Sequence, residues 1–160
     1  MRRISIFRAA ALLLAAAMLA AQPKPASGFD LASLKGSYAS RETGDGHVSA
    51  GLGIVTYDGE GNSTRKFTVN APDGAGGRQI LIFTAVGTYN VNEDGTGVAI
   101  YDTTLPDGSV ATRTFDLVIT GVEAWPPGKP SRIAAQVSTA QREAGVTVKL
   151  VTGIQTRIND

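Results

Sequence analysis

The stretch AGLGIVTYDGEGN, residues 50–62, decides the fold of this chain. Its first eight residues are rich in β-forming side chains. The Asp58-Gly59 pair that follows is typical of a tight hairpin, because glycine accepts the positive φ that such turns require. The chain then returns through residues 63–69, crosses a glycine-rich loop and runs out again along residues 79–90. Residues 50–90 therefore predict three antiparallel strands.

Glycines inside the first of these strands indicate that the sheet closes on itself. Gly51 and Gly53 alternate along residues 50–57, so they share one face of the strand with Val55. A glycine weakens a strand unless the strand coils sharply or another backbone comes close to it. Both conditions hold where a sheet curls into a small barrel.

Turn signals continue at a regular spacing along the chain. Asp-Gly pairs recur at residues 94–95 and 107–108, each between β-rich segments, and this pattern favours a sandwich or a barrel. A short helical turn is expected at residues 29–34, and strands are expected at residues 35–41, 49–57, 63–69, 79–90, 97–103, 109–120, 132–140 and 146–157. Eight strands predict an all-β, closed antiparallel barrel, whose interior is filled by side chains or holds one small ligand.

The alternation of apolar side chains predicts which faces point into the barrel. In residues 109–120, Phe115, Leu117 and Ile119 share one side and are expected inside. In residues 146–157, Val148, Leu150 and Ile154 alternate with Lys149, Gln155 and Arg157. The side chains expected to plug the lumen, if the barrel is solid, are Leu52, Phe83, Phe115 and Leu150.

Residues 79–90 are apolar on both faces. Leu81, Phe83 and Tyr89 lie on one side, and Ile80, Ile82 and Val86 lie on the other. A strand of this kind is expected to be covered on both sides. The expected cover is the N-terminal turn, the proline-rich loop or a second subunit, so a homo-oligomer stays open.

Residues 1–28 are expected to be a signal peptide and spacer outside the fold. Arg2, Arg3 and Arg8 flank the start of an apolar run, residues 9–21, which is short for a bilayer span and is followed by prolines. We expect the mature N-terminus between residues 22 and 29. Residues 29–160 would then be a single barrel domain, secreted or periplasmic, with no membrane span.

Charge and composition exclude several classes of function. The chain has a formal net charge of +1; without the three arginines of residues 1–21 it keeps 12 basic and 14 acidic residues, a net charge of −2. A mildly acidic protein lacks the excess of positive charge that is typical of proteins that bind nucleic acid. The chain contains no cysteine, which excludes disulfides, thiolate metal sites, a cysteine nucleophile and a lipid-modified cysteine.

Three segments carry a resemblance: LKGSYA (residues 34–39), GIVTYDGEGN (53–62) and GTYNVNEDGTG (87–97). Here the chain resembles a group of small secreted bacterial proteins with lipocalin-like or allene-oxide-cyclase-like barrels. Gly36-Ser37-Tyr38 is similar in position to the Gly-x-Trp that opens a lipocalin, with tyrosine in place of tryptophan. The resemblance covers most of residues 29–160 and implies the barrel. It implies no catalytic residue.

No cluster carries a specific motif for catalysis or metal binding. His47, the only histidine, is too close along the chain to its Asp and Ser neighbours for a triad. The acidic turn at residues 58–62 lacks the downstream glutamate of an EF-hand, and residues 74–78 lack the Lys-Ser/Thr of a phosphate loop. Asp107 and Asp116 are not expected to converge with Asp102. We predict no catalytic residue, metal site or cofactor.

The fold class favours binding of a small, mainly apolar ligand in the lumen. The predicted ligand-binding residues are aromatic: Tyr38, Phe83, Tyr89, Tyr101, Phe115 and Trp125. Trp125 is the only tryptophan and precedes two prolines, so the segment 122–130 is expected to close one end, as rim packing or as a lid. Two alternatives stay open: an isomerase or cyclase using Tyr38, Tyr89 or Asp102, and a solid structural or adhesive module.

Overall fold

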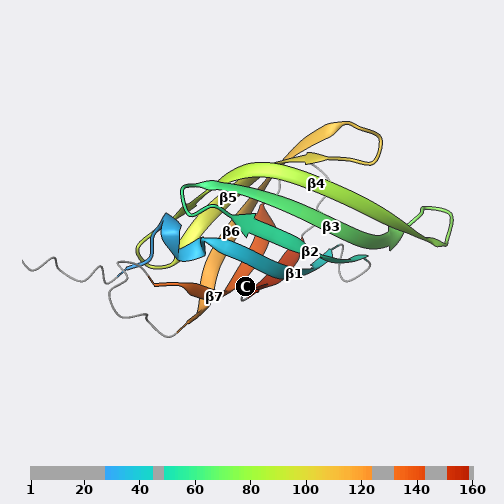
Figure 1. Cartoon of the computed structure of the whole chain (residues 1–160). Coiled ribbons are helices and arrows are strands. Elements are labelled where there is room, and N and C mark those ends of the chain that lie inside the picture. The colour runs from blue at the N-terminus through green and yellow to red at the C-terminus, as the bar shows by residue number, and fades with distance from the viewer. Residues whose placement is uncertain (1–27, 45–48, 124–131, 143–150, 159–160) are drawn as a thin grey trace, which may run out of the picture.

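Eight antiparallel strands follow one another around a closed barrel (Figure 1). The computed structural model describes residues 28–44, 49–123, 132–142 and 151–158. A 3-10 helix, η1 (Leu31–Leu34), precedes the strands. The strands are β1 (Gly36–Gly44), β2 (Ser49–Tyr57), β3 (Asn62–Pro72), β4 (Arg78–Val91), β5 (Thr96–Thr104), β6 (Val110–Val122), β7 (Ala134–Arg142) and β8 (Thr152–Arg157).

The barrel closes because β1 pairs with β8 as well as with β2. The β1–β8 register runs from Tyr38 opposite Arg157 to Thr43 opposite Thr152. Every described strand therefore has two hydrogen-bonded neighbours, although the first part of β4, residues 78–83, pairs only with β3. The predicted all-β class and the closed eight-stranded antiparallel barrel are confirmed, and so are the hairpin turns at the Asp-Gly pairs.

Inward glycines let the barrel wall coil tightly. A Cβ on Gly53 would lie 2.2 Å from the carbonyl oxygen of Lys66 and 2.8 Å from the Phe67 ring on the neighbouring strand. Gly87 and Gly97 are equally close to backbone carbonyl oxygens of the strands beside them. Each of these glycines leaves room for the large side chain that faces it across the strand pair. The expectation of close backbone approach at Gly53 is confirmed.

The end of the barrel near η1 is packed solid with tyrosine rings, and we call this part the tyrosine half. Tyr57 packs edge-on against Tyr38, with ring centroids 5.5 Å apart, and against Tyr89, at 4.9 Å. Leu34, from η1, is completely buried beside them. η1 itself is held by a capping box, in which Asp30 and Ser33 bond reciprocally to each other's backbone N–H. The tyrosine half thus needs no ligand to fill it.

Two of the predicted strand faces are wrong. Leu52 and Ile154 are 65% and 43% exposed on the outer wall, whereas Gln155 is 2% exposed and points inward. On β2 the glycines face inward because Phe67 occupies the space in front of Gly53. On β8 the amide oxygen of Gln155 accepts a 2.9 Å hydrogen bond from the Tyr57 hydroxyl, which satisfies a polar group inside the barrel.

The predicted inward face of β6 is confirmed, whereas the outer face of β4 lacks the expected cover among the described residues. Phe115 and Leu117 on β6 are buried as predicted, with Ile119 packed against the core. On β4 the outer side chains Ile80, Ile82 and Val86 are 59–64% exposed, and no described segment covers them.

Candidate functional site

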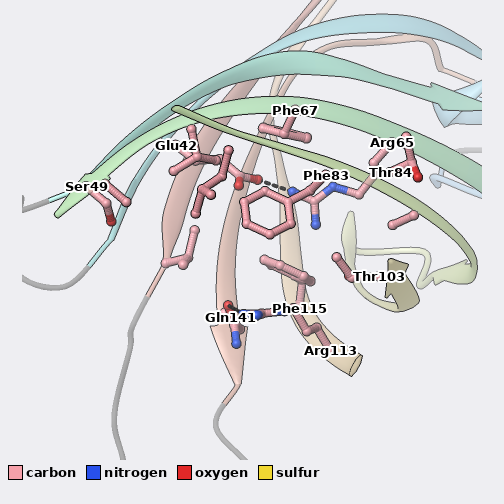
Figure 2. A pocket seen from close by; sticks show the side chains of 15 residues that line it. Glu42, Ser49, Arg65, Phe67, Phe83, Thr84, Thr103, Arg113, Phe115 and Gln141 are labelled. Carbon is pink, nitrogen blue, oxygen red and sulfur yellow. Dashed lines mark hydrogen bonds and ion pairs between the residues drawn. The ribbon is translucent and has the colours of Figure 1, made fainter. Parts of the chain in front are cut away.

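A cavity of about 210 Å³ occupies the part of the lumen farthest from η1, and we call this part the cavity half (Figure 2). Its residues come from the strand ends opposite the tyrosine half. The lining residues are Glu42, Ser49, Arg65, Phe67, Val69, Ala71, Leu81, Phe83, Thr84, Ala85, Thr103, Arg113, Phe115, Gln141 and Val151. Most of this wall is apolar, and the charged side chains are few.

Strand β3 shows how the cavity deepens. Side chains two residues apart point to the same face of a strand, so Arg65, Phe67, Val69 and Ala71 line the cavity in a row. Arg65 and Phe67 are 9% and 5% exposed, whereas Val69 and Ala71 are only half-buried. The row therefore runs from a buried floor at Arg65 toward the accessible end at Ala71.

The floor holds a buried ion pair between Arg65 and Glu42, drawn as a dashed line in Figure 2. The Arg65 guanidinium also lies 4.4 Å from the ring centroid of Phe115, 4.5 Å from that of Phe67 and 4.7 Å from that of Tyr101. Aromatic faces attract a cation, more strongly where water is excluded. Arg65 is thus fixed by one carboxylate and three rings, and it separates the cavity from the tyrosine half.

Burial raises the pKa of Glu42 above its usual 4.5, and the positive charges of Arg65 and Arg113 oppose that rise. Desolvation disfavours a charged carboxylate, whereas nearby cations favour it. Glu42 is therefore a carboxyl group whose proton is held more tightly than in water, at the edge of an apolar cavity.

Arg113 is the second guanidinium of the cavity. Among the described residues, its guanidinium donates a long hydrogen bond of 3.5 Å to the amide oxygen of Gln141 on β7. Its Nε is buried and has no hydrogen-bond partner among the described residues, and the same holds for the Nε of Arg65. Because buried donors in folded proteins are nearly always bonded, these two N–H groups are available to an acceptor that enters the cavity.

The predicted ligand-binding residues divide between the two halves. Phe83 and Phe115 line the cavity, and Tyr101 lies under it with its ring 5.9 Å from Phe115. Tyr38 and Tyr89 belong to the tyrosine half, where their hydroxyls donate to the backbone carbonyls of Ala134 and Leu31. Those two rings do not line the cavity.

Trp125 and His47 lie outside the described residues. The strand ends that flank the Trp125 segment, at Val122 and Ala134, are at the η1 end, since Ala134 bonds the Tyr38 hydroxyl. The cavity is at the other end of the barrel. The glycine-rich loop at residues 73–77, in contrast, joins β3 to β4 at the same end as the cavity, and Figure 1 shows this green hairpin projecting away from η1.

The acidic side chains weighed from the sequence lie on the outside. Asp102 is exposed and accepts a 2.7 Å hydrogen bond from Thr112. Hydrogen bonds from Asn62 and from two backbone N–H groups lower the pKa of Asp58, which closes its own turn. Within the described ranges, no three His, Asp or Glu side chains are grouped as a metal site. The same ranges contain no helix long and apolar enough to cross a membrane.

The charged floor was missed by the sequence analysis, although one signal for it was present. Phe115 was placed inside the barrel, and residues two apart share a face, so Arg113 should point the same way. The same parity links Arg65 to Phe67. No role was assigned to Arg65, Arg113 or Glu42 from the sequence, because nothing local shows that Glu42 on β1 meets Arg65 on β3.

Together, the fold and the cavity define a class: a small closed antiparallel barrel with one packed half and one hollow half. Comparisons with protein-family models, with curated proteins and with solved structures gave no match. The resemblance to lipocalins and allene oxide cyclases is therefore supported only as far as the closed barrel itself.

Proposed function

We propose that this protein is an exported barrel that binds a small, mainly apolar ligand in the cavity half. The observation that carries the proposal is the cavity of about 210 Å³ with its largely apolar wall. Pockets that bind small molecules are concave and mostly apolar, with a few polar groups that fix orientation. Phe67, Phe83 and Phe115 would supply the apolar contacts, and Arg113 and Gln141 the polar ones.

The size of the cavity limits the ligand. An enclosed apolar space of about 150 Å³ is large enough for benzene. A cavity of about 210 Å³ therefore suits a compact ring system or a short alkyl chain. The half-buried Val69 and Ala71, toward the accessible end, allow part of a longer ligand to extend out of the lumen.

The contrast within the lumen supports a binding protein over a solid structural module. A structural barrel gains stability from side chains that fill its whole interior, as the tyrosine half does. The cavity half keeps a hollow, and buried Nε groups of two arginines face no acceptor among the described residues. Both features cost stability in the free protein, which a bound ligand would restore.

A second candidate function rests on Glu42. Its raised pKa and its position at the cavity suit a group that gives and takes a proton during an isomerisation. Incubating the barrel with the ligand it binds, and analysing the recovered ligand by mass spectrometry, separates the two functions. A ligand recovered unchanged supports binding alone, and a rearranged ligand that stays unchanged with Glu42→Gln supports the isomerase.

Filling the cavity tests the binding proposal directly. Ala71→Phe places a ring at the accessible end of the cavity, whereas Ala50→Phe places the same ring on the exposed outer face of β2. We expect Ala71→Phe to lose binding of apolar probes such as toluene and 1-octanol, measured by calorimetry, and Ala50→Phe to bind as wild type does. Equal binding by the two variants would contradict a site in this cavity.

Export is tested separately. N-terminal sequencing of the protein from the exported fraction of its host should place the mature N-terminus between residues 22 and 29. Native mass spectrometry of the same sample would show a ligand that co-purifies. An intact Met1 in the membrane fraction would contradict export.

A further inference from the structure

We infer that the ligand of this cavity is an apolar carboxylate, with its carboxylate group bound by Arg113. The inference rests on the proposed function, because it names the chemical class of a ligand for the same cavity. Three observations carry it: the balance of charges, the buried donors without partners and the apolar wall around them.

The charges of the described residues that line the cavity do not cancel. Two guanidinium groups, Arg65 and Arg113, face one carboxylate, Glu42. Glu42 is already paired with Arg65, whose guanidinium is also enclosed by three aromatic rings. With Glu42 ionised, the described residues that line the cavity carry one positive charge in excess. A charge in an apolar environment is costly unless it is paired, so the cavity is complementary to a single negative charge.

Arg113 has the hydrogen-bonding capacity that a carboxylate needs. Its Nε is buried and has no partner among the described residues, and within those residues its side chain makes one hydrogen bond, the long one to Gln141. A guanidinium binds a carboxylate through two parallel N–H···O bonds, which are short and strong because both partners are charged. The amide nitrogen of Gln141 can donate a further bond, since its oxygen faces Arg113.

The apolar wall of the cavity favours a ligand whose part beyond the carboxylate is apolar. Phe67, Val69, Leu81 and Phe83 line the cavity above the floor, and none of them offers a side-chain hydrogen bond. Because Arg113 and Gln141 lie together on one part of the lining (Figure 2) and most of the remaining wall is apolar, the ligand is oriented with its carboxylate at this pair and its apolar body against the phenylalanine and aliphatic side chains.

The test compares octanoate with 1-octanol, which share a chain length and differ in charge. Calorimetry at neutral pH should show that wild type binds octanoate at least about tenfold more tightly than 1-octanol, a difference of about 1.4 kcal/mol. Arg113→Gln should lose most of that preference and still bind 1-octanol. Arg41→Gln removes the same charge from an exposed side chain on β1, so it should leave both affinities unchanged.

Two further variants test the role of charge independently of Arg113→Gln. Glu42→Gln raises the positive excess, so it should tighten octanoate binding several-fold and leave 1-octanol binding unchanged. Arg113→Lys keeps the positive charge and should retain part of the octanoate preference, even if Arg113→Gln does not fold.

The outcomes separate this inference from the proposed function. If neither octanoate, 1-octanol nor toluene binds, the proposed function itself is wrong. If 1-octanol binds as tightly as octanoate, or if Arg113→Gln and Arg41→Gln have the same effect on octanoate, ligand binding stands and the carboxylate inference is overturned.

Discussion

The two halves of the lumen are built by the same eight strands and differ in nearly everything else. In the tyrosine half, rings pack edge to edge, and the hydroxyls of Tyr38, Tyr57 and Tyr89 all have hydrogen-bond acceptors. In the cavity half, Arg65 and Arg113 line an apolar hollow, and each has a buried Nε without a partner among the described residues. The buried Nη1 of Arg157, beside Tyr38, likewise lacks a partner among those residues, so the hollow is what distinguishes the two halves. One half is therefore close-packed, and the other keeps the hollow in which we propose that a ligand binds.

Strand β3 shows the change along a single element. At its η1 end, Ser63 donates a hydrogen bond of 3.1 Å to the hydroxyl of Tyr101 and is almost completely buried. Four inward positions later along the strand, Ala71 lies at the accessible end of the cavity. The strand is regular throughout, so the division into halves comes from side-chain size and from η1 covering one end.

Removing a ring from each half should give the largest contrast. Tyr57 is 2% exposed and contacts two other tyrosine rings, so Tyr57→Ala should cost about 3–5 kcal/mol of unfolding free energy, as expected for a deleted buried aromatic residue. Phe83→Ala, at the half-buried cavity wall, should cost clearly less stability and should weaken ligand binding instead. Urea unfolding and calorimetry measure the two effects. Equal losses of stability would contradict the division into halves.

Gly53 sharpens the comparison at the boundary between the halves. Gly53→Ala would place its Cβ 2.2 Å from the Lys66 carbonyl oxygen, so the wall must shift, at a cost of about 1–3 kcal/mol. Gly51→Ala is the matched control on the same face, because its nearest contact is a Val69 methyl group at 3.2 Å. Urea midpoints of the two variants that agree with each other would show that the wall is not tightly coiled at Gly53.

The pH dependence of stability should report the charged floor. Because the folded pKa of Glu42 is raised above 4.5, its contribution to stability is present below pH 4.5 and is lost as pH rises through the folded pKa. The stability of wild type relative to Glu42→Gln should therefore fall as pH increases over that window, in urea titrations. A relative stability that rises instead would mean that the attraction of Arg65 outweighs the burial of Glu42.

The tyrosine half should titrate only at high pH. Burial raises the pKa of Tyr38 and of Tyr89 to about 12, and it also raises above 10.0 the pKa of Tyr57 and of Tyr101, which lies between the tyrosine half and the cavity. Their contribution to stability is full below pH 10 and is lost as pH rises through the folded pKa values. Ultraviolet titration should show tyrosine ionisation well above pH 10 in the folded protein and near pH 10 in urea. Ionisation near pH 10 without urea would contradict a sealed tyrosine half.

The outer wall should give the smallest effect. Arg142 and Asp116 form an ion pair with about half of each side chain exposed, and exposed pairs contribute little because water and salt screen them. Asp116→Asn should leave the melting temperature nearly unchanged. A change as large as that of Glu42→Gln would show that burial does not distinguish the floor pair from the surface pair.

The sequence by itself determined the barrel. Asp-Gly turns, the lengths of the β-rich segments and glycines within a strand, such as Gly53, are local signals, and they led to eight strands and to closure, while the alternation of apolar residues led to the burial of Phe115. The turns needed only the backbone freedom of glycine, and the strands only alternation with a period of two. The cavity residues Phe83 and Phe115 were also found in this way.

Only the tertiary structure decided which side chains meet inside the barrel. Leu52 faces outward because Phe67 fills the space before Gly53, and Ile154 faces outward because Gln155 bonds Tyr57 within the lumen. The pairing of Glu42 with Arg65 joins side chains 23 residues apart in the chain. The burial of a charged residue on a strand cannot be predicted from its own segment, because its ion-pair partner and the aromatic rings around it come from other strands. The charged floor is therefore a property of the closed barrel, because closure is what brings those strands together.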